Sequence, residues 1–313
     1  MALELILGVA GLILLTLGAD HLVLGSSRVA ARLRLSPVVV GVVVIGLGTS
    51  APEFLVSGVA AATGTPGIAV GNIVGSNILN LTFVLGMAAL VAPVAVASTV
   101  VRREVPLAVG AVALFAIASL AGLTAPVGIA LLAVLAGALV LLIRWAKAGP
   151  DPELADEVEE FTTPARPTRM AYEIPRALAG LAGVLIGANL IVDNASSLAS
   201  RFGVSDLVIG VTVVAIGTSL PELVTTIQAQ RRGETDLVVG NLFGSNLFNS
   251  LAGGAVIGLA SGSDAAAPEH ALLGVMLLVA LLAWALLRRG LRLTRPEGLI
   301  LIVAYAATLP LLL

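Results

Sequence analysis

Long apolar stretches, separated by short polar or Pro/Gly-rich breaks, dominate the chain. Several of them reach the roughly 20 residues that a helix needs to cross the hydrocarbon core of a bilayer. Reading each stretch as a helix predicts ten membrane spans. They lie near residues 3–26, 37–62, 68–92, 104–123, 126–145, 173–199, 206–230, 237–260, 269–288 and 296–313. The first follows Met1-Ala2-Leu3-Glu4, which has no basic leader region, so it is interpreted as a true span and not as a signal peptide.

The positions of the basic residues test this helix count, because cytoplasmic loops of membrane proteins collect Lys and Arg. All of the 17 basic residues except Arg201 lie in or beside the odd-numbered loops. A wrong helix count would scramble this pattern. We therefore expect a multi-pass protein of the cell inner (plasma) membrane, with odd-numbered loops in the cytoplasm and both termini outside.

The one long hydrophilic stretch, residues 149–170, then becomes an acidic cytoplasmic linker. Its six acids raise the alternative of a calcium-sensing loop. They lack the ordered oxygen spacing and the turn glycine of such a loop, which favours a solvated connection.

Composition narrows the chemistry further. Hydrophobic residues make up 58% of the chain and charged residues 12%, about half the share in a soluble domain, and the mean hydropathy is +1.07. The net charge of −2 gives no bulk field that would attract nucleic acid. Without cysteine, and with only two histidines, the chain cannot form disulfides, thiolate metal sites or a histidine-rich metal site. No cofactor and no obligate protein partner is indicated.

An internal repeat organises the chain. A shift of 169 residues places Gly48–Glu53 on Gly217–Glu222 and Gly71–Asn77 on Gly240–Asn246 without a gap. Each copy holds five predicted spans, an odd number, so the two copies enter the membrane from opposite sides. We expect an all-α integral membrane fold of two inverted five-helix repeats, 1–148 and 171–313, with the repeated motifs near 41–86 and 210–255. This is the plan of secondary transporters, whose site lies at the repeat interface, where Gly/Pro-interrupted helices meet.

Two carboxylates, Glu53 and Glu222, lie near the middle of the second and seventh predicted spans. A carboxylate at that depth costs roughly 2.5–3.5 kcal/mol on insertion scales, so it needs a cation, a proton or a polar cavity. Two acids at equivalent repeat positions favour a cation site over protonated carboxyls that merely pack in the core.

Pro52 and Pro221 immediately precede these acids and break the regular backbone hydrogen bonding of their helices. The loosened turns offer further oxygens. These are the carbonyls of Thr49 and Thr218 and the hydroxyls of Ser50 and Ser219. Because an all-oxygen site suits hard cations, the set points to Ca²⁺ and Na⁺.

A polar stripe follows each motif at spacing i, i+4, i+8, formed by Asn72, Ser76 and Asn80 and again by Asn241, Ser245 and Asn249. We expect Ser76, Asn80, Ser245 and Asn249 to face the ions. Asn72, Asn77, Asn241 and Asn246 are either ligands or braces for the unwound turns. The repeated Gly-x-x-x-Gly pairs also fit ordinary close helix packing. Asp20 and Asp193, the other acids inside spans, are interpreted as helix-end or pathway-lining groups, and His21 as structural.

The two G-T-S-x-P-E and two G-N-x-x-G-S-N-x-x-N segments resemble the α-repeats of the cation/calcium exchanger superfamily, in particular its prokaryotic sodium/calcium exchanger (calcium/sodium antiporter) branch. This resemblance implies a ten-helix fold with alternating access. It implies a calcium site of Glu53, Glu222 and the carbonyls of Thr49 and Thr218. It also implies sodium positions at Ser50, Ser76, Ser219 and Ser245 with the carbonyls of Gly46 and Ala215, and it places Asn80 and Asn249 beside the centre.

The branch assignment depends on three positions. Proton-coupled relatives usually carry an acid where this chain has Gly75 and Gly244, and potassium-dependent relatives usually carry Asp at the position of Asn249. The resemblance therefore implies a secondary antiporter that exchanges Na⁺ for Ca²⁺. A Ca²⁺/H⁺ antiporter and, less favoured, a cation channel stay open as alternatives. An intramembrane enzyme is poorly supported, because no nucleophile–base pair is present.

Overall fold

The computed structural model describes residues 2–33, 35–147, 170–202, 215–261 and 270–312, and these residues are almost entirely helical. In the first repeat the elements are α1 (Ala2–Leu33), α2 (Pro37–Val40), π-helix η1 (Gly41–Gly46), α3 (Leu47–Thr49), α4 (Ala51–Ala62), α5 (Pro66–Leu79), π-helix η2 (Asn80–Val84), α6 (Leu85–Val91), β1 (Val94–Ala95), α7 (Ser98–Arg102), α8 (Glu104–Ala121) and α9 (Ala125–Lys147). In the second they are α11 (Met170–Arg201), α13 (Ala215–Thr218), α14 (Leu220–Arg231), α15 (Thr235–Phe248), π-helix η5 (Asn249–Gly253), α16 (Gly254–Ala260), α17 (His270–Gly290), β2 (Arg292–Leu293) and α18 (Arg295–Leu312).

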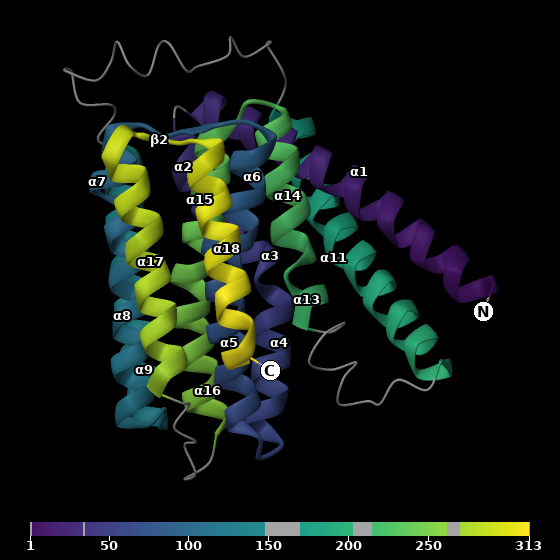
Figure 1. The fold of residues 1–313 in the computed structure, drawn as a ribbon. Coiled ribbons are helices and arrows are strands. Elements are labelled where there is room, and N and C mark those ends of the chain that lie inside the picture. The colour runs from purple at the N-terminus through teal and green to yellow at the C-terminus, as the bar shows by residue number, and fades with distance from the viewer. Residues whose placement is uncertain (1, 34, 148–169, 203–214, 262–269, 313) are drawn as a thin grey trace.

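The sequence repeat reappears as a repeat of elements. Adding 169 to the bounds of α4, α5, η2 and α6 gives the bounds of α14, α15, η5 and α16. The copies are inverted, because the α4–α5 turn lies at the lower end of the bundle in Figure 1 and the α14–α15 turn at the upper end. The repeat thus extends to the two π-helices η2 and η5, which interrupt the two copies at matching positions.

Each predicted span has helical counterparts in the described residues, although the seventh and ninth begin, and the tenth ends, outside them. Seven of the described helices are long and apolar enough to cross a membrane, or up to eight if Pro37–Thr49 and Ala51–Ala62, bent by 44°, form one span. The fold is therefore that of a multi-pass membrane protein, while the count of ten spans stays a prediction. The linker lies outside the described residues except for Met170, which begins α11.

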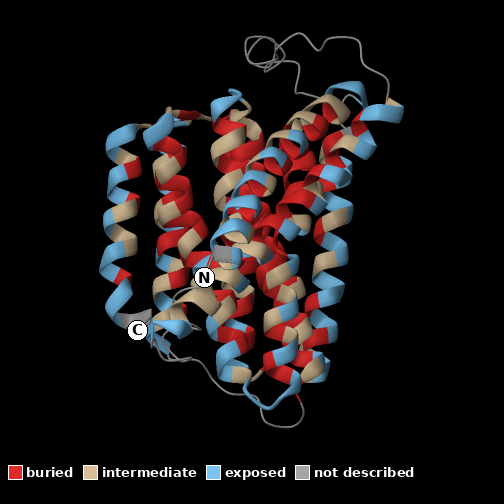
Figure 2. Cartoon of the chain, turned by 90° about the vertical axis from the view of Figure 1, so that its right-hand side faces the viewer, coloured by how far each residue is buried: buried red, intermediate tan, exposed pale blue. Residues whose placement is uncertain are grey.

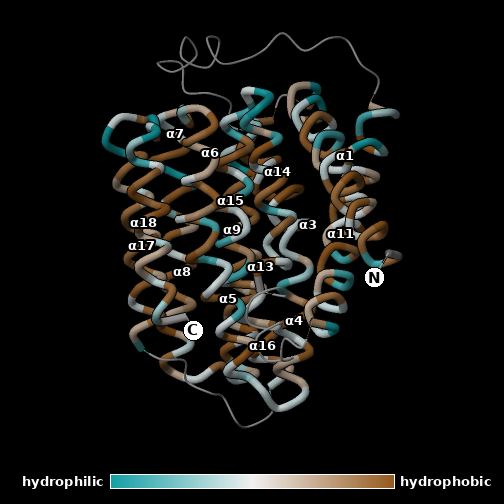
Figure 3. The backbone as a smooth tube through the Cα atoms, turned by 45° about the vertical axis from the view of Figure 1, so that its right-hand side comes forward, coloured by the Kyte–Doolittle hydropathy of each residue, from teal (hydrophilic) through white to brown (hydrophobic). Residues whose placement is uncertain are grey.

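The packing places apolar side chains outside and many polar ones inside. Figure 2 shows buried residues along the inward faces of the helices, and Figure 3 shows hydrophobic segments along the outside of the bundle. The stretches Pro66–Val91 and Thr235–Ala260 are 72% and 83% buried over their most apolar windows, whereas Ala125–Ala146 is 22% buried. The two most enclosed helices are thus the pair that carries the Asn/Ser stripes.

α1 and α11 pack side by side, and Figure 1 shows them leaning away from the bundle toward the end that holds the N-terminus. Glycines let their backbones touch: a Cβ at Gly180 would lie 2.4 Å from the amide nitrogen of Leu22, and one at Gly187 would lie 2.5 Å from that of Leu15. Such small-residue tracks permit close approach between membrane helices. The pair therefore forms one unit.

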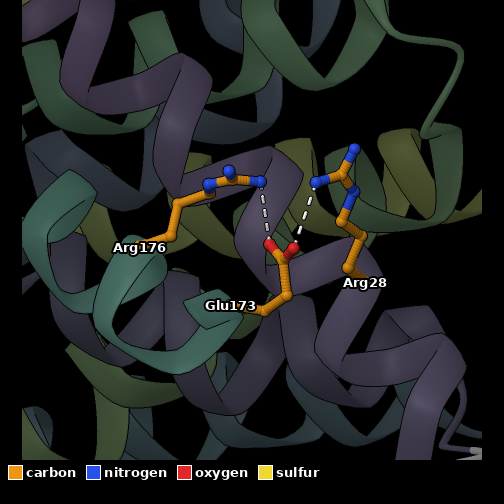
Figure 4. Close-up of polar contacts among 3 residues, drawn as sticks. All are labelled: Arg28, Glu173 and Arg176. Atoms are coloured by element: carbon orange, nitrogen blue, oxygen red, sulfur yellow. Dashed lines mark hydrogen bonds and ion pairs between the residues drawn. The ribbon is translucent and has the colours of Figure 1, made fainter. Parts of the chain in front are cut away.

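Ionic contacts and a short strand ladder gather at the upper end. Glu173 of α11 is 3% exposed, and its carboxylate pairs with Arg28 of α1 at 3.1 Å and with Arg176 at 2.9 Å (Figure 4). β1 and β2 pair antiparallel at the same end and join the loops after α6 and α17. Both loops are odd-numbered in the sequence prediction, which agrees with their lying on one side.

The glycines at the α1–α11 contact, which include Gly180 and Gly187, give a stability prediction. For Gly→Ala, helix propensity favours a more stable protein, whereas close packing favours a less stable one. Ala exceeds Gly in helix propensity by about 1 kcal/mol, so Gly8→Ala, where a Cβ meets no atom within 4 Å, should be neutral or stabilising. Gly187→Ala should instead lower the apparent melting temperature of the detergent-solubilised protein, because overpacking costs roughly 1–3 kcal/mol. Equal effects of the two variants would contradict the close α1–α11 packing.

Candidate cation site

Two broken helices meet at the centre of the described bundle. The first helix breaks at Ser50, whose backbone angles are φ −80° and ψ 4°, and the second at Ser219, with φ −94° and ψ 6°. Pro52 and Pro221 follow at the first turns of α4 and α14, where a missing N–H costs little. The predicted interruption of both helices is confirmed at matching positions.

The carboxylates Glu53 and Glu222 follow directly after these breaks, and both side chains are fully buried. Each accepts a hydrogen bond from the serine of the opposite repeat: Ser219 Oγ donates to Glu53 Oε1 at 3.3 Å, and Ser50 Oγ donates to Glu222 Oε1 at 3.2 Å. Ser245 Oγ lies 3.3 Å from the same Glu222 oxygen. The repeats therefore exchange polar contacts across the pseudo-two-fold axis.

The Oε2 atoms of both glutamates are also buried, and they accept no hydrogen bond from the described residues. The two carboxylates are close enough for the charge of Glu222 to act on Glu53. Buried acceptors are normally satisfied, and two neighbouring charges in a low dielectric repel each other. This arrangement has the charge and the free acceptor atoms to hold a hard cation.

The asparagines Asn72 and Asn241 brace the broken helices. Asn72 Nδ2 donates to the Glu53 carbonyl at 3.2 Å, and Asn241 Nδ2 donates to the Glu222 carbonyl at 3.4 Å. Asn241 also donates to the hydroxyls of Thr225 and Thr226 at 3.1 and 3.0 Å. Of the two roles left open by the sequence, these contacts favour bracing.

A second polar cluster fills the space between α5 and α15. Asn80 Nδ2 donates to Asn246 Oδ1 at 3.2 Å, and Asn246 Nδ2 donates to the Asn77 carbonyl at 2.9 Å. Asn249 is fully buried, and neither its side-chain oxygen nor its nitrogen has a partner among the described residues. Asn80 and Asn249 each begin a π-helix, a feature frequent at functional sites that the sequence analysis missed.

Close backbone packing brings α2 and η1 against α15. A Cβ at Gly240 would lie 2.5 Å from the Val38 carbonyl oxygen, and one at Gly46 would lie 2.9 Å from the Ser245 amide nitrogen. Ser245 Oγ in turn lies 3.3 Å from the Gly46 carbonyl oxygen. The predicted Gly-x-x-x-Gly packing is thus present in the second repeat, whereas a Cβ at Gly71 or Gly75 meets no atom within 4 Å.

Of the sequence-predicted ligands, Ser50, Ser219 and Ser245 contact the two glutamates directly. Thr49, Ser50, Ser76, Asn80, Thr218, Ser219, Ser245 and Asn249 are all buried. Ala215 opens α13, one turn before the second break. Their roles as ligands stay predictions, because no ion contact has been observed.

Asp20 and Asp193 lie away from the glutamates. The Asp20 carboxylate accepts hydrogen bonds from Nε and Nη2 of Arg232, a pairing between α1 and the end of α14 that the sequence did not indicate. Asp193 lines a cavity of about 570 Å³ between α4, α11 and α13. Their interpretation as helix-end and pathway-lining groups agrees with these positions.

An inverted repeat of membrane helices, with one buried acid of each repeat at a shared centre, defines a secondary transporter and not an enzyme. The family model for sodium/calcium exchanger proteins matches residues 3–144 and 176–313. The chain belongs to this sodium/calcium exchanger family.

Relatives of nearly full length support this assignment. A protein of Alkalimonas amylolytica, provisionally named antiporter CaxA, is 40% identical over 97% of both chains. The sodium/calcium exchanger MaX1 of Methanosarcina acetivorans is 27% identical over 96% of both. Among solved structures, the sodium-calcium exchanger NCX_Mj soaked with 2.5 mM Na⁺ and 0.1 mM Ca²⁺ superposes with a TM-score of 0.85, at 32% identity over 98% of each chain.

The bracing role of Asn241 can be separated from a ligand role. Asn241→Ala removes one donor from the buried Glu222 carbonyl and one from each of the Thr225 and Thr226 hydroxyls. The carbonyl keeps the hydrogen bond from Thr225 Oγ1, and a buried group left without any partner costs about 1–3 kcal/mol. We expect a lower melting temperature both with and without Ca²⁺, and a smaller loss for Asn72→Ala, whose amide donates only to the Glu53 carbonyl and Ser57. A variant with unchanged apo stability that no longer gains stability from Ca²⁺ would identify Asn241 as a ligand instead.

Proposed function

We propose that the chain is a secondary active antiporter that exchanges Na⁺ for Ca²⁺ across the cell membrane by alternating access. The single observation that supports this most strongly is the pair of fully buried carboxylates, Glu53 and Glu222, where the two broken helices meet. Their Oε2 atoms accept no hydrogen bond from the described residues. The hydroxyls of Ser50, Ser219 and Ser245 contact the pair, and an all-oxygen set of this kind suits hard cations.

In this mechanism Ca²⁺ and Na⁺ compete for the same two carboxylates. Glu53, Glu222 and the carbonyls of Thr49 and Thr218 bind Ca²⁺. Sodium ions use the same acids together with flanking oxygens. These are the hydroxyls of Ser50, Ser76, Ser219 and Ser245, the carbonyls of Gly46 and Ala215, and the amides of Asn80 and Asn249.

Charge balance explains why transport is coupled. One Ca²⁺ neutralises the two carboxylates, and about three Na⁺, the usual number in this family, leave one net positive charge. An empty site would carry two bare charges through a low-dielectric barrier, which is expensive. Only loaded sites cross, and the exchange responds to voltage at about 2.3 kcal/mol per charge per 100 mV.

The alternation itself is supported by a difference between symmetry-related positions. Asp20 and Ser27 of α1 contact Arg232 and Glu234 at the α14–α15 turn. Their repeat mates on α11, Asn189 and Ser196, line the cavity instead. We infer that this conformation is closed at the end of the α14–α15 turn, on the cytoplasmic side, and open at the other. Both termini then lie outside the cell.

Transport by the paired acids is tested in proteoliposomes. A Na⁺ gradient should drive ⁴⁵Ca²⁺ uptake, and Glu53→Gln or Glu222→Gln should reduce uptake to background, because each removes one of the two charges that balance Ca²⁺. The paired control is the same assay with a pH gradient and no Na⁺. Uptake driven only by the pH gradient would favour a Ca²⁺/H⁺ antiporter, and flux independent of the ion on the opposite side would indicate a channel.

The closed cytoplasmic end is tested by thiol labelling. Because the chain has no cysteine, a single introduced cysteine is its only thiol. Val23 is fully buried, whereas its repeat mate Val192 lines the cavity. Arg232→Gln removes the partner of Asp20 and should raise cytoplasmic labelling of Val23→Cys about two- to fivefold, the shift that a partly exposed ion pair supports, while external labelling of Val192→Cys falls.

Arg231→Gln removes a neighbouring exposed arginine and serves as the matched control, because it should leave both labelling rates unchanged. If Arg232→Gln raises or lowers both rates together, the contact stabilises the fold and does not bias the alternation.

A further inference from the structure

The cavity between α4, α11 and α13 borders both helix breaks of the candidate site. Its lining includes Ala51 and Pro52 at the first helix break and Gly217 and Thr218 at the second. α11 supplies the opposite wall. An ion that approaches the carboxylates from this end therefore passes the α11 side chains.

That wall carries a polar stripe. Asn189, Asp193 and Ser196 stand at spacing i, i+4, i+7 and so share one helix face. The Asp193 side chain is exposed, and the described residues provide its carboxylate with no hydrogen bond or ion pair. A carboxylate within a membrane-length helix persists only where it faces water or cations. Asp193 thus places an uncompensated negative charge on the cavity wall.

The simplest alternative is that Asp193 forms half of an external ion pair, equivalent to Asp20–Arg232. The repeat argues against it. The position that matches Asp20 is Asn189, the position that matches Arg232 is Thr63, and Asp193 itself matches Leu24. Closure of this end would therefore bring no arginine to Asp193.

The basic residue nearest along α11 does not screen this charge, because it is already engaged. Arg201 at the end of the helix pairs with Glu4 of α1. The acid on the cavity wall consequently has no acidic counterpart in the first repeat and no basic partner among the described residues.

We propose that Asp193 captures cations in the external cavity and raises their concentration beside the site without ligating them there. A cleft with a charge of one sign and low-dielectric walls concentrates counter-ions and accelerates their binding. The attraction scales with ion charge, so it favours Ca²⁺ over Na⁺. This inference rests on the proposed exchange, and it assigns Asp193 as a positioning residue that acts on one face only.

The first test measures the KM for Ca²⁺ from each side separately. In right-side-out, Na⁺-loaded vesicles at low ionic strength, Asp193→Asn should raise the KM for external Ca²⁺ about three- to tenfold with little change in maximal rate. In everted vesicles the KM should be unchanged. Asp193→Glu should restore the wild-type value, and Asn189→Ala, which keeps the charge, should match the wild type.

Salt provides an internal check. Because exposed charges are screened at high ionic strength, 0.5 M N-methylglucamine chloride should bring the external KM values of wild type and Asp193→Asn together. Equal KM changes on both faces, or a fall in maximal rate with unchanged KM, would show a structural role and overturn the proposal.

A second test does not depend on transport. In an Asn189→Cys background, one turn from Asp193, the ratio of labelling rates for a cationic and an anionic methanethiosulfonate reagent reports the local potential. Asp193→Asn should lower this ratio about threefold or more. An unchanged ratio overturns the capture role even if exchange is normal. Absent exchange in the wild type with a lowered ratio would instead overturn only the proposed function.

Discussion

Two carboxylates lie together in a centre shielded from water, and the surrounding structure offsets part of the free-energy cost of burying their charges. Glu53 and Glu222 are each fully buried, which would be costly without a compensating cation or polar shell. The helix breaks at Ser50 and Ser219 supply part of that shell, since each serine donates to the glutamate of the other repeat. The braces then follow from the breaks, because Asn72 and Asn241 satisfy backbone carbonyls next to the loosened turns. The site and the fold around it therefore solve one electrostatic problem together.

The internal repeat accounts for the nearly two-fold arrangement of the candidate site. Differences between the repeats bear on which side of the membrane the proposed transporter faces at rest. The bounds of α4, α5, η2 and α6 recur in α14, α15, η5 and α16 at a constant offset of 169 residues, so the centre is nearly two-fold. The peripheral helices are not equivalent in their contacts: Asp20 of α1 is paired with Arg232, whereas its mate Asn189 faces a cavity. A perfectly symmetric chain would favour both faces equally. In the proposed mechanism, the Asp20–Arg232 pair, whose repeat positions are Asn189 and Thr63, gives such a chain a preferred resting state.

Much of this could be predicted from the sequence, because the repeat is ungapped and its polar residues stand out in apolar segments. The breaks beside Pro52 and Pro221 and the shared centre of Glu53 and Glu222 follow from steric and solvation rules that need no tertiary information. The Asp20–Arg232 pair, with its 212-residue separation, does not follow, because pairing of distant charges depends on how α1 crosses the bundle. The seven-residue spacing of Gly11, Gly18 and Gly25 indicates that one face of α1 packs closely against another helix. The structure was needed to identify that helix as α11.

The acids in and beside the candidate cation site occupy two kinds of position: Glu53 and Glu222 lie at the site, and Asp193 lies on the wall of the cavity beside it. In the proposed exchanger, Asn80 and Asn249 add no charge to the two carboxylates, so one Ca²⁺ would neutralise the centre. A third acid there would hold the ion more tightly and slow its release. An acid in the cavity has a different effect, because it raises the local cation concentration without adding a ligand. Such a charge changes how often external ions reach the site, while the equilibrium of the exchange is still set by the ion gradients and the membrane potential. Under the proposed capture role, placing Asp193 on the wall and not at the centre would speed the binding of external ions and still let the centre release either ion.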